Sequence, residues 1–288
     1  MGVRSETPTT LRTPRDRAMA VDQVCQVAGP EGLSPEHRDL VREEPLLITL
    51  NDRPVTTLMC SPGDEILLAL GYLYTEGIIA SGAEVGAIAF CPEFPAGNVV
   101  RVFPAGASDW ESRLSAHRTV FSSCGICGSE VIRSVASGIK PFDRPTGRLS
   151  RRVICELAEW MSSRQTVFKR TGGIHAAALV RVRGGRPAAD TLIVKEDVGR
   201  HNALDKAVGC AIQTGLDLRE CLLMLSGRLS FEMVAKAARA GVSDVAAVGA
   251  PTTLAVETAA QLNMFLAGFV RGESATVYVG AAALAPEA

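Results

Sequence analysis

Two cysteines lie two residues apart in the segment FSSCGICGSE, which runs from Phe121 to Glu130. The residues around Cys124 and Cys127 are mostly glycines and serines, so few bulky side chains shield the thiols. A thiol pair at this spacing can supply part of a metal site, cycle between dithiol and disulfide, or carry sulfur as a persulfide. The rest of the chain has to decide among these three chemistries.

A zinc site is the least favoured of the three. Zinc needs about four protein ligands or open positions, and the chain has no second C-x-x-C and no H-x-x-x-H. A zinc deaminase would show H-x-E before its cysteine pair, whereas His175 follows the cysteines and Ala177 stands where the glutamate would be. We therefore expect no permanently bound metal.

Sulfur carriage ranks above disulfide cycling. A thioredoxin-type pair follows an early strand, whereas this pair lies mid-chain in a flexible glycine- and serine-rich loop. A helix over SEVIRSVAS, directly after Cys127, would lower the pKa of a nearby thiol and favour the thiolate. A movable loop can also carry an atom between two sites. The other cysteines stand singly in apolar surroundings and are expected to be small buried hydrophobes: Cys25, Cys60, Cys91, Cys155, Cys210 and Cys221.

Three junctions between a strand and a helix hold most of the polar chemistry in the second half of the chain. They read EDVGRHN, LSGRLSF and GAPTTLA. Ligands of α/β sheets bind beyond the carboxyl ends of strands, where helix N-termini attract phosphate. The candidate anion-binding residues at these junctions are Asp197, Arg200, His201, Asn202, Ser226, Gly227, Arg228 and Thr252.

These residues have expected roles that differ in kind. Arg200 and Arg228 would grip a phosphate or carboxylate, and Asp197 would accept from a ribose hydroxyl or a base. A single junction of this type is most often an ordinary cap or turn, and Ser230 and Thr253 are expected to be caps. His201 is weighed evenly between an anion contact and a structural role. His175, after two glycines at a strand start, is expected to be structural.

The pattern of apolar segments predicts a mixed α/β protein. Residues 1–38 are polar and proline-bearing and are expected to form a mobile tail. Residues 39–148 are expected to form an N-terminal α+β part that carries the cysteine loop. Residues 149–288 alternate strands with helices, including a long helix over TTLAVETAAQLNMFLAGF, and predict an α/β domain.

Composition excludes several classes of partner. The formal net charge of -1 gives no broad basic footprint for nucleic acid. The N-terminus has no apolar core typical of a secretion signal, and no run approaches the roughly 20 apolar residues of a membrane span. A cytoplasmic location, where thiols stay reduced, is therefore expected.

Five motifs in order resemble the FdhD family, the sulfur-carrier accessory proteins of formate dehydrogenase. They are FSSCGICGSE, TGGIHAAAL, KEDVGRHNALDKAVG, SGRLSFEMVAKAARAG and TTLAVE, and the helix SPGDEILLALGYLYTEGII matches as well. The resemblance runs from about Glu43 to Tyr278. It implies a cytidine-deaminase-like α/β/α fold for the C-terminal domain and a homodimer.

The resemblance also implies a function. Family members take sulfur from a cysteine desulfurase and pass it to the molybdenum or tungsten bis-molybdopterin guanine dinucleotide cofactor that formate dehydrogenase requires. Cys124 matches the essential persulfide-bearing cysteine, and Cys127 matches the second cysteine of the motif. The family's nucleotide-binding segment corresponds here to Phe269, Val270, Arg271, Gly272, Glu273 and Ser274, between the long helix and the last strand. This chain reads RGES where many members carry a proline and a second basic residue.

Two other functions stay open from the sequence. A cofactor chaperone would bind the same ligand without transferring sulfur, and its activity would depend on Arg228 but on neither cysteine. A thiol–disulfide redox protein would form a reversible disulfide between Cys124 and Cys127.

Overall fold

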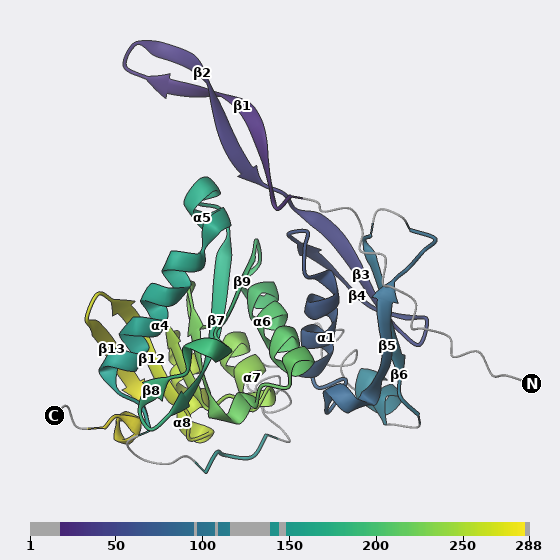
Figure 1. Cartoon of the computed structure of the whole chain (residues 1–288), viewed down its shortest axis with the longest axis vertical. Helices are drawn as coiled ribbons and strands as arrows, with labels where there is room; N and C mark the ends of the chain where they lie inside the picture. The colour runs from purple at the N-terminus through teal and green to yellow at the C-terminus, as the bar shows by residue number, and fades with distance from the viewer. Residues whose placement is uncertain (1–17, 95–96, 107–108, 116–138, 144–147, 286–288) are drawn as a thin grey trace, which may run out of the picture.

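The computed structural model describes residues 18–94, 97–106, 109–115, 139–143 and 148–285. These residues form a mixed α/β protein with two sheets in its body and a projecting two-stranded ribbon (Figure 1). The cysteine motif, with Cys124 and Cys127, lies outside the described residues.

The larger sheet belongs to the C-terminal half. Its strand order is β13-β12-β11-β10-β7, and β8 and β9 both pair with the other edge of β7. The strands β10, β11 and β12 are parallel, whereas β7 is antiparallel to β10 and to β9. The start of β7 therefore lies at the edge where β9 to β12 end. The bounds are β7 His175–Arg183, β8 Arg186–Pro187, β9 Ile193–Asp197, β10 Cys221–Leu225, β11 Asp244–Ala247, β12 Phe265–Arg271 and β13 Ser274–Val279.

Helices cover both faces of this sheet, which explains why its strands are apolar throughout. Leu223 and Leu225 of β10 pack among residues of three helices, α6, α7 and α8. Leu222 and Met224, which alternate with them, pack against α4 on the other face. A strand that is buried on both faces has no polar side to show. The helix bounds are α4 Arg151–Arg164, α5 Thr166–Thr171, α6 Arg200–Thr214, α7 Phe231–Arg239 and α8 Thr253–Gln261.

The prediction of a long helix after the third junction is wrong for the second half of that segment. The helix α8 ends at Gln261, and β12 begins at Phe265. Asn263, with φ of 52°, takes the left-handed conformation that ends a helix, and Met264 N–H bonds back to Ala259. The apolar run that follows alternates between the two faces of the sheet, so it packs better as a strand.

The N-terminal half forms a four-stranded sheet in the order β4-β3-β6-β5. The helix α1 packs on this sheet with Leu68 and Leu73 fully buried, and its other side meets α6. The bounds are β3 Glu44–Leu50, β4 Arg53–Cys60, α1 Glu65–Thr75, β5 Val85–Phe90 and β6 Val99–Pro104.

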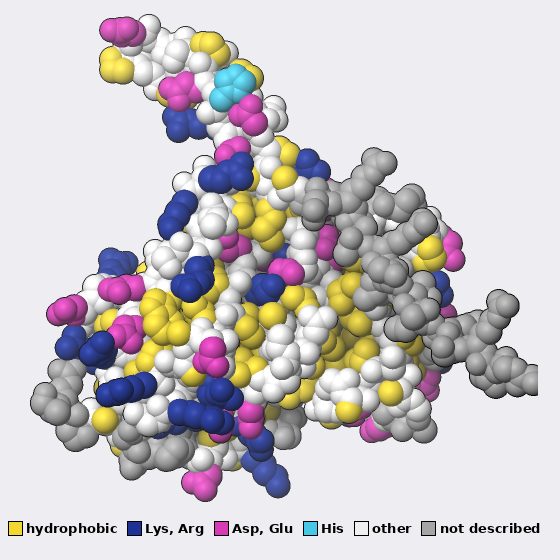
Figure 2. All heavy atoms as spheres, in the orientation of Figure 1, with side chains coloured by type: hydrophobic (Ala, Val, Ile, Leu, Met, Phe, Trp, Pro, Cys, Tyr) yellow, Lys and Arg dark blue, Asp and Glu magenta, His cyan; other side chains and the backbone are white. Residues whose placement is uncertain are grey.

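The prediction of a mobile tail is wrong for residues 20–38. The strands β1 (Ala20–Gly29) and β2 (Gly32–Val41) pair over their whole length as an antiparallel hairpin that stands clear of the body (Figures 1 and 2). Arg170 of α5 holds its base through an ion pair of 2.8 Å to Asp39. Most of its side chains face solvent, so it lacks the apolar stripe that would reveal a strand in the sequence.

No helix among the described residues is long and apolar enough to cross a lipid bilayer.

The two halves of the chain meet where α1 crosses α6 at two glycines. A Cβ on Gly71 would lie 1.8 Å from the backbone oxygen of Asp205, and a Cβ on Gly209 would lie 2.0 Å from that of Leu67. Any side chain at either position would force the helices apart. The crossing therefore fixes the start of α6, and with it the first polar junction, against the N-terminal half.

The close crossing predicts that one methyl group added at Gly71 strongly destabilises the protein. The substitution Gly71→Ala should lower the free energy of unfolding by about 3 kcal/mol, because backbone atoms cannot yield cheaply to the new Cβ. Urea unfolding followed by circular dichroism measures the change. Gly29→Ala is the matched control, since its Cβ would meet nothing closer than 4.0 Å. Equal stability of the two variants would contradict the close crossing.

Candidate functional site

The three polar junctions meet at one edge of the large sheet. Ala176 N–H of β7 donates to Ser226 Oγ over 2.8 Å, which joins the start of β7 to the second junction. Leu229 N–H donates to Ala250 O over 3.0 Å, which joins the second junction to the third. The first junction joins this edge because His175 of β7 lies opposite Asp197 and the Cβ position of Gly227 is 3.8 Å from Arg200 Cβ.

Glycines leave the backbone bare where these strands end. A Cβ on Gly249 would lie 2.5 Å from Gly227 O, and a Cβ on Gly268 would lie 3.0 Å from Gly249 O. The three strand ends therefore lie in direct backbone contact, with no room for side chains between them. A flat ligand group can approach such a glycine row, here defined as Gly227, Gly249 and Gly268, more closely than it could approach side chains.

Two arginines flank the glycine row without a counter-charge. Arg200 is the first residue of α6 and is half-buried, and Arg228 is exposed in the second junction. Neither forms an ion pair with another residue in the described part of the chain, and the buried Arg200 Nε has no hydrogen-bond partner there. Guanidinium groups left in this state suit a phosphate or carboxylate from outside the protein.

Asp197 serves the fold, which corrects the expectation that it contacts a ribose or base. Its side chain is fully buried, and its Oδ2 lies 2.7 Å from Lys206 Nζ. Ser61 N–H donates to Oδ2 over 3.1 Å, and Gly199 N–H and Asn202 Nδ2 each donate to Oδ1 over 2.9 Å. These contacts occupy both oxygens, so no ligand reaches the carboxylate.

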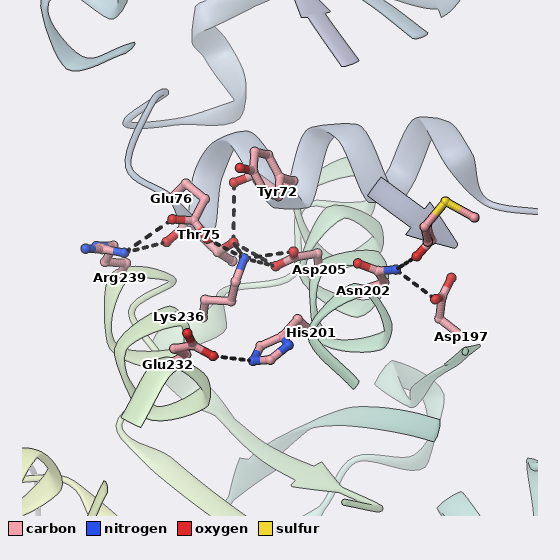
Figure 3. Close-up of polar contacts among 11 residues, drawn as sticks. Tyr72, Thr75, Glu76, Asp197, His201, Asn202, Asp205, Glu232, Lys236 and Arg239 are labelled. Atoms are coloured by element: carbon pink, nitrogen blue, oxygen red, sulfur yellow. Dashed lines mark hydrogen bonds and ion pairs between the residues drawn. The ribbon is translucent and has the colours of Figure 1, made fainter. Parts of the chain in front are cut away.

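Asn202 is likewise a structural residue in this conformation. Its side chain is almost fully buried, and Nδ2 also donates to Met59 O over 2.8 Å (Figure 3). It thereby joins α6 to the end of β4, 143 residues earlier in the chain.

A second buried charge cluster connects α7 to α1 and α6 near the crossing of these two helices. Lys236 of α7 lies 2.8 Å from Asp205 and 2.8 Å from Glu76, and its Nζ donates to Thr75 Oγ1 over 2.9 Å (Figure 3). Burial alone would lower the pKa of Lys236, but the two carboxylates outweigh it and raise the pKa above its usual value. The lysine is therefore a permanent cation of the core.

His201 lies against Glu232. Its Nε2 lies 3.0 Å from the Glu232 carboxylate (Figure 3). Burial lowers the pKa of His201, Glu232 opposes the change, and Arg200 and Lys236 add to it. In this conformation the imidazole already has a partner within the protein.

His175 lies closer to the site than its sequence context indicates. The Cβ position of Gly227 is 3.3 Å from His175 Nδ1 and 3.8 Å from Arg200 Cβ. Burial lowers the pKa of His175, and Arg200 and Arg228 lower it further. No sequence signal reveals this neighbourhood, because the antiparallel placement of β7 beside β10 brings it about.

The neutral hydroxyls of the site bond to backbone groups. Thr252 caps α8 by accepting from Ala255 N–H over 3.3 Å, so the cap is Thr252 and not the expected Thr253. Ser226 accepts from Ala176 N–H, as described above. Ser230 precedes α7 at the cap position, but its side chain makes no capping hydrogen bond.

The segment Phe269–Ser274 forms the hairpin end of β12 and β13, which corrects its expected place after a long helix. Phe269 N–H donates to Gly249 O over 3.2 Å, so the segment begins beside the glycine row. Phe269 has φ of 53° and its side chain is 43% exposed. Val270 is buried, Arg271 and Glu273 are exposed, Gly272 makes the turn, and Ser274 Oγ bonds to Arg271 O over 3.1 Å.

The isolated cysteines behave as expected where they are buried. Cys60, Cys91, Cys155 and Cys221 are buried, and burial raises the pKa of Cys60 and of Cys221 to about 12. Thiols with such pKa values do not ionise at neutral pH. Cys25 and Cys210 are half-buried.

The described residues on either side of the cysteine motif are anchored to different halves of the molecule. Before the motif, Trp110 and Leu114 are buried in the core of the N-terminal half. After it, Phe142 N–H donates to Leu262 O over 2.9 Å at the end of α8. Within the described ranges, no cluster of three or more histidine, cysteine, aspartate or glutamate side chains is arranged to hold a metal ion.

Comparison with known proteins identifies the family. The model of the FdhD/NarQ family matches residues 41–285. The chain belongs to the FdhD/NarQ family. The hairpin β1–β2 lies almost wholly before the matched region, whereas both sheets of the body lie within it.

Curated relatives match along most of their length. The Sulfur carrier protein FdhD of Streptomyces coelicolor is 41% identical over 251 residues, which cover 84% of this chain and 87% of that protein. The Sulfur carrier protein FdhD of Mycobacterium bovis is 36% identical over 284 residues, which cover 93% and 96%.

A solved structure shares the fold. The crystal structure of a formate dehydrogenase accessory protein from Desulfotalea psychrophila superposes with a TM-score of 0.71 at 23% sequence identity. The match covers 94% of this chain and 99% of that one.

The unpaired arginines predict a local effect on anion binding. Arg228→Ala should weaken binding of inorganic pyrophosphate about tenfold, because one charge-assisted contact is lost, and should leave the melting temperature unchanged. Isothermal titration calorimetry and thermal unfolding measure the two effects. Arg186→Ala is the control, because Arg186 is exposed in β8 beside the far end of β7. Similar weakening in both variants would show that the anion senses only general surface charge.

Proposed function

We propose that this protein is a sulfur carrier that loads Cys124 with persulfide sulfur from a cysteine desulfurase. It then passes the sulfur to the bis-molybdopterin guanine dinucleotide cofactor that formate dehydrogenase requires. Membership of the FdhD/NarQ family and the names of the curated relatives support this proposal. Further support comes from the chemistry of the sheet edge.

The observation that carries the proposal is the pair Arg200 and Arg228, which form no ion pair with any described carboxylate and lie beside the glycine row. Asp197, which lies close to the same site, is paired with Lys206 at 2.7 Å, so its carboxylate does not compensate the charge of Arg200 or Arg228. The starts of α6 and α7 add free N–H groups on the same side. A pyrophosphate-linked nucleotide fits this set of donors, and the exposed ring of Phe269 offers a surface for its base.

The proposed chemistry has two steps. The Cys124 thiolate attacks the outer sulfur of a desulfurase persulfide, forms a new S–S bond and releases the desulfurase cysteine as a thiolate. The outer sulfur then moves to the reduced metal of the cofactor, which supplies two electrons and makes it sulfide, while Cys124 leaves as a thiolate. Cys127 is proposed to assist the first cysteine.

Other features belong to the same proposal. They are a homodimer, a cytoplasmic location and a cytidine-deaminase-like relationship of the C-terminal sheet. The cofactor would be a bound substrate, and the protein would need no metal of its own.

Mass spectrometry after incubation with a cysteine desulfurase and cysteine tests the loading step. The wild-type protein should gain the mass of one or more sulfur atoms on Cys124, and Cys124→Ala should lose both this mass and the ability to mature formate dehydrogenase. Cys155→Ala, which removes a buried thiol, is the control for a general effect of losing a cysteine.

The same variants separate the two alternative functions. A cofactor chaperone predicts that Cys124→Ala and Cys127→Ala still mature the enzyme while Arg228→Ala does not. A redox protein predicts a disulfide between Cys124 and Cys127 that titrates reversibly against a glutathione couple. Either result would replace sulfur transfer as the function.

A further inference from the structure

We propose that His175 is the third phosphate-binding side chain of the site at the sheet edge, and that its protonation couples ligand binding to pH. The proposal rests on the proposed function, because it concerns the same ligand. It gives a binding role to a residue that the sequence indicates to be structural.

The first argument is the position of the ring. His175 begins β7, which the sheet places between β9 and β10, so its side chain lies among the ends of these strands. Its Nδ1 is 3.3 Å from the point where a Cβ of Gly227 would be. The absence of a side chain at Gly227 therefore leaves the imidazole open toward the glycine row.

The second argument is the lack of a partner. Neither ring nitrogen of His175 has a hydrogen bond or ion pair with another residue in the described ranges. By contrast, His201 lies against Glu232 at 3.0 Å, and His37 lies against Asp22 at 2.7 Å. A half-buried imidazole without a partner loses hydrogen bonds to water unless a ligand supplies one.

The third argument is the charge around the ring. Arg200 faces it from the start of α6, Arg228 from the junction between β10 and α7, and Asp197 from the end of β9. Asp197 is committed to Lys206 at 2.7 Å. The ring thus shares its surroundings with two arginines that have no ion pair among the described residues, and a phosphate bound by both arginines would lie within its reach.

The sign of the pH effect follows from these charges. Burial, Arg200 and Arg228 lower the pKa of His175 below 6.5 in the free protein. A bound phosphate would offset the arginines and raise the pKa of His175 in the complex. A group whose pKa rises on binding makes binding tighter as the pH falls, and the effect is lost above the pKa of the complex.

The test needs a ligand whose own charge does not change with pH. In di(guanosine) pyrophosphate both phosphates are esterified, so their charge stays constant between pH 5.5 and 7.5. Calorimetry should show that the wild-type protein binds it about threefold to tenfold more tightly at pH 5.5 than at pH 7.5. His175→Gln, which keeps a hydrogen-bonding group but cannot be protonated, should abolish this dependence.

Two other histidines serve as comparisons. His37→Gln, in the projecting hairpin, should retain the full pH dependence. If His201→Gln removes the pH dependence of binding and His175→Gln does not, His201 rather than His175 couples binding to pH, and the proposal is wrong. A proton NMR titration of the His175 ring should also show its pKa rising when the dinucleotide is added, which a purely structural histidine would not show.

The outcomes separate this proposal from the one on which it rests. Binding that is equally tight at both pH values would overturn the role of His175 alone. Absence of binding by the wild-type protein at either pH would remove the nucleotide site, and His175 with it. Loss of persulfide loading in an otherwise binding-competent protein would contradict sulfur carriage and leave the role of His175 intact.

Discussion

Two buried ion clusters between the halves of the chain fix the position of α6, and with it the first polar junction, against the N-terminal half. Lys206 pairs with Asp197 and also donates to the Ser61 carbonyl, while Lys236 pairs with Asp205 and Glu76. Removing one partner of such a buried pair typically costs about 3–5 kcal/mol, since the other charge is left without compensation. Together with the glycine crossing of α1 and α6, these clusters lock the start of α6 in place.

The same clusters leave the site basic. Because Lys206 and three hydrogen-bond donors occupy Asp197, this carboxylate is unavailable to Arg200. Gly227, Gly249 and Gly268, in or just after β10, β11 and β12, bring the backbones of these strands into direct contact. The fold therefore leaves the positive charges of Arg200 and Arg228 at a sheet edge that is formed mainly by backbone groups.

The sequence predicts local patterns well and distant partners poorly. The apolar run of β10 and the three junctions are recognisable in the sequence, because each depends on a few adjacent residues. The sequence does not reveal the structural role of Asp197, because its partner Ser61 lies 136 residues away. The hairpin β1–β2 has no clear sequence signal, because both its faces are largely exposed. The end of α8 is equally hard to predict, because an apolar run fits a helix or a buried strand.

The transfer of labelled sulfur tests the central claim most directly. Protein carrying a radioactive persulfide would be mixed with formate dehydrogenase that holds the unsulfurated cofactor, and the label reaching the enzyme would be counted. The account predicts that wild-type protein delivers its sulfur, whereas a variant with Arg200→Ala and Arg228→Ala loads fully but retains the label. Delivery by that variant at the wild-type rate would contradict the claim that these arginines hold the acceptor.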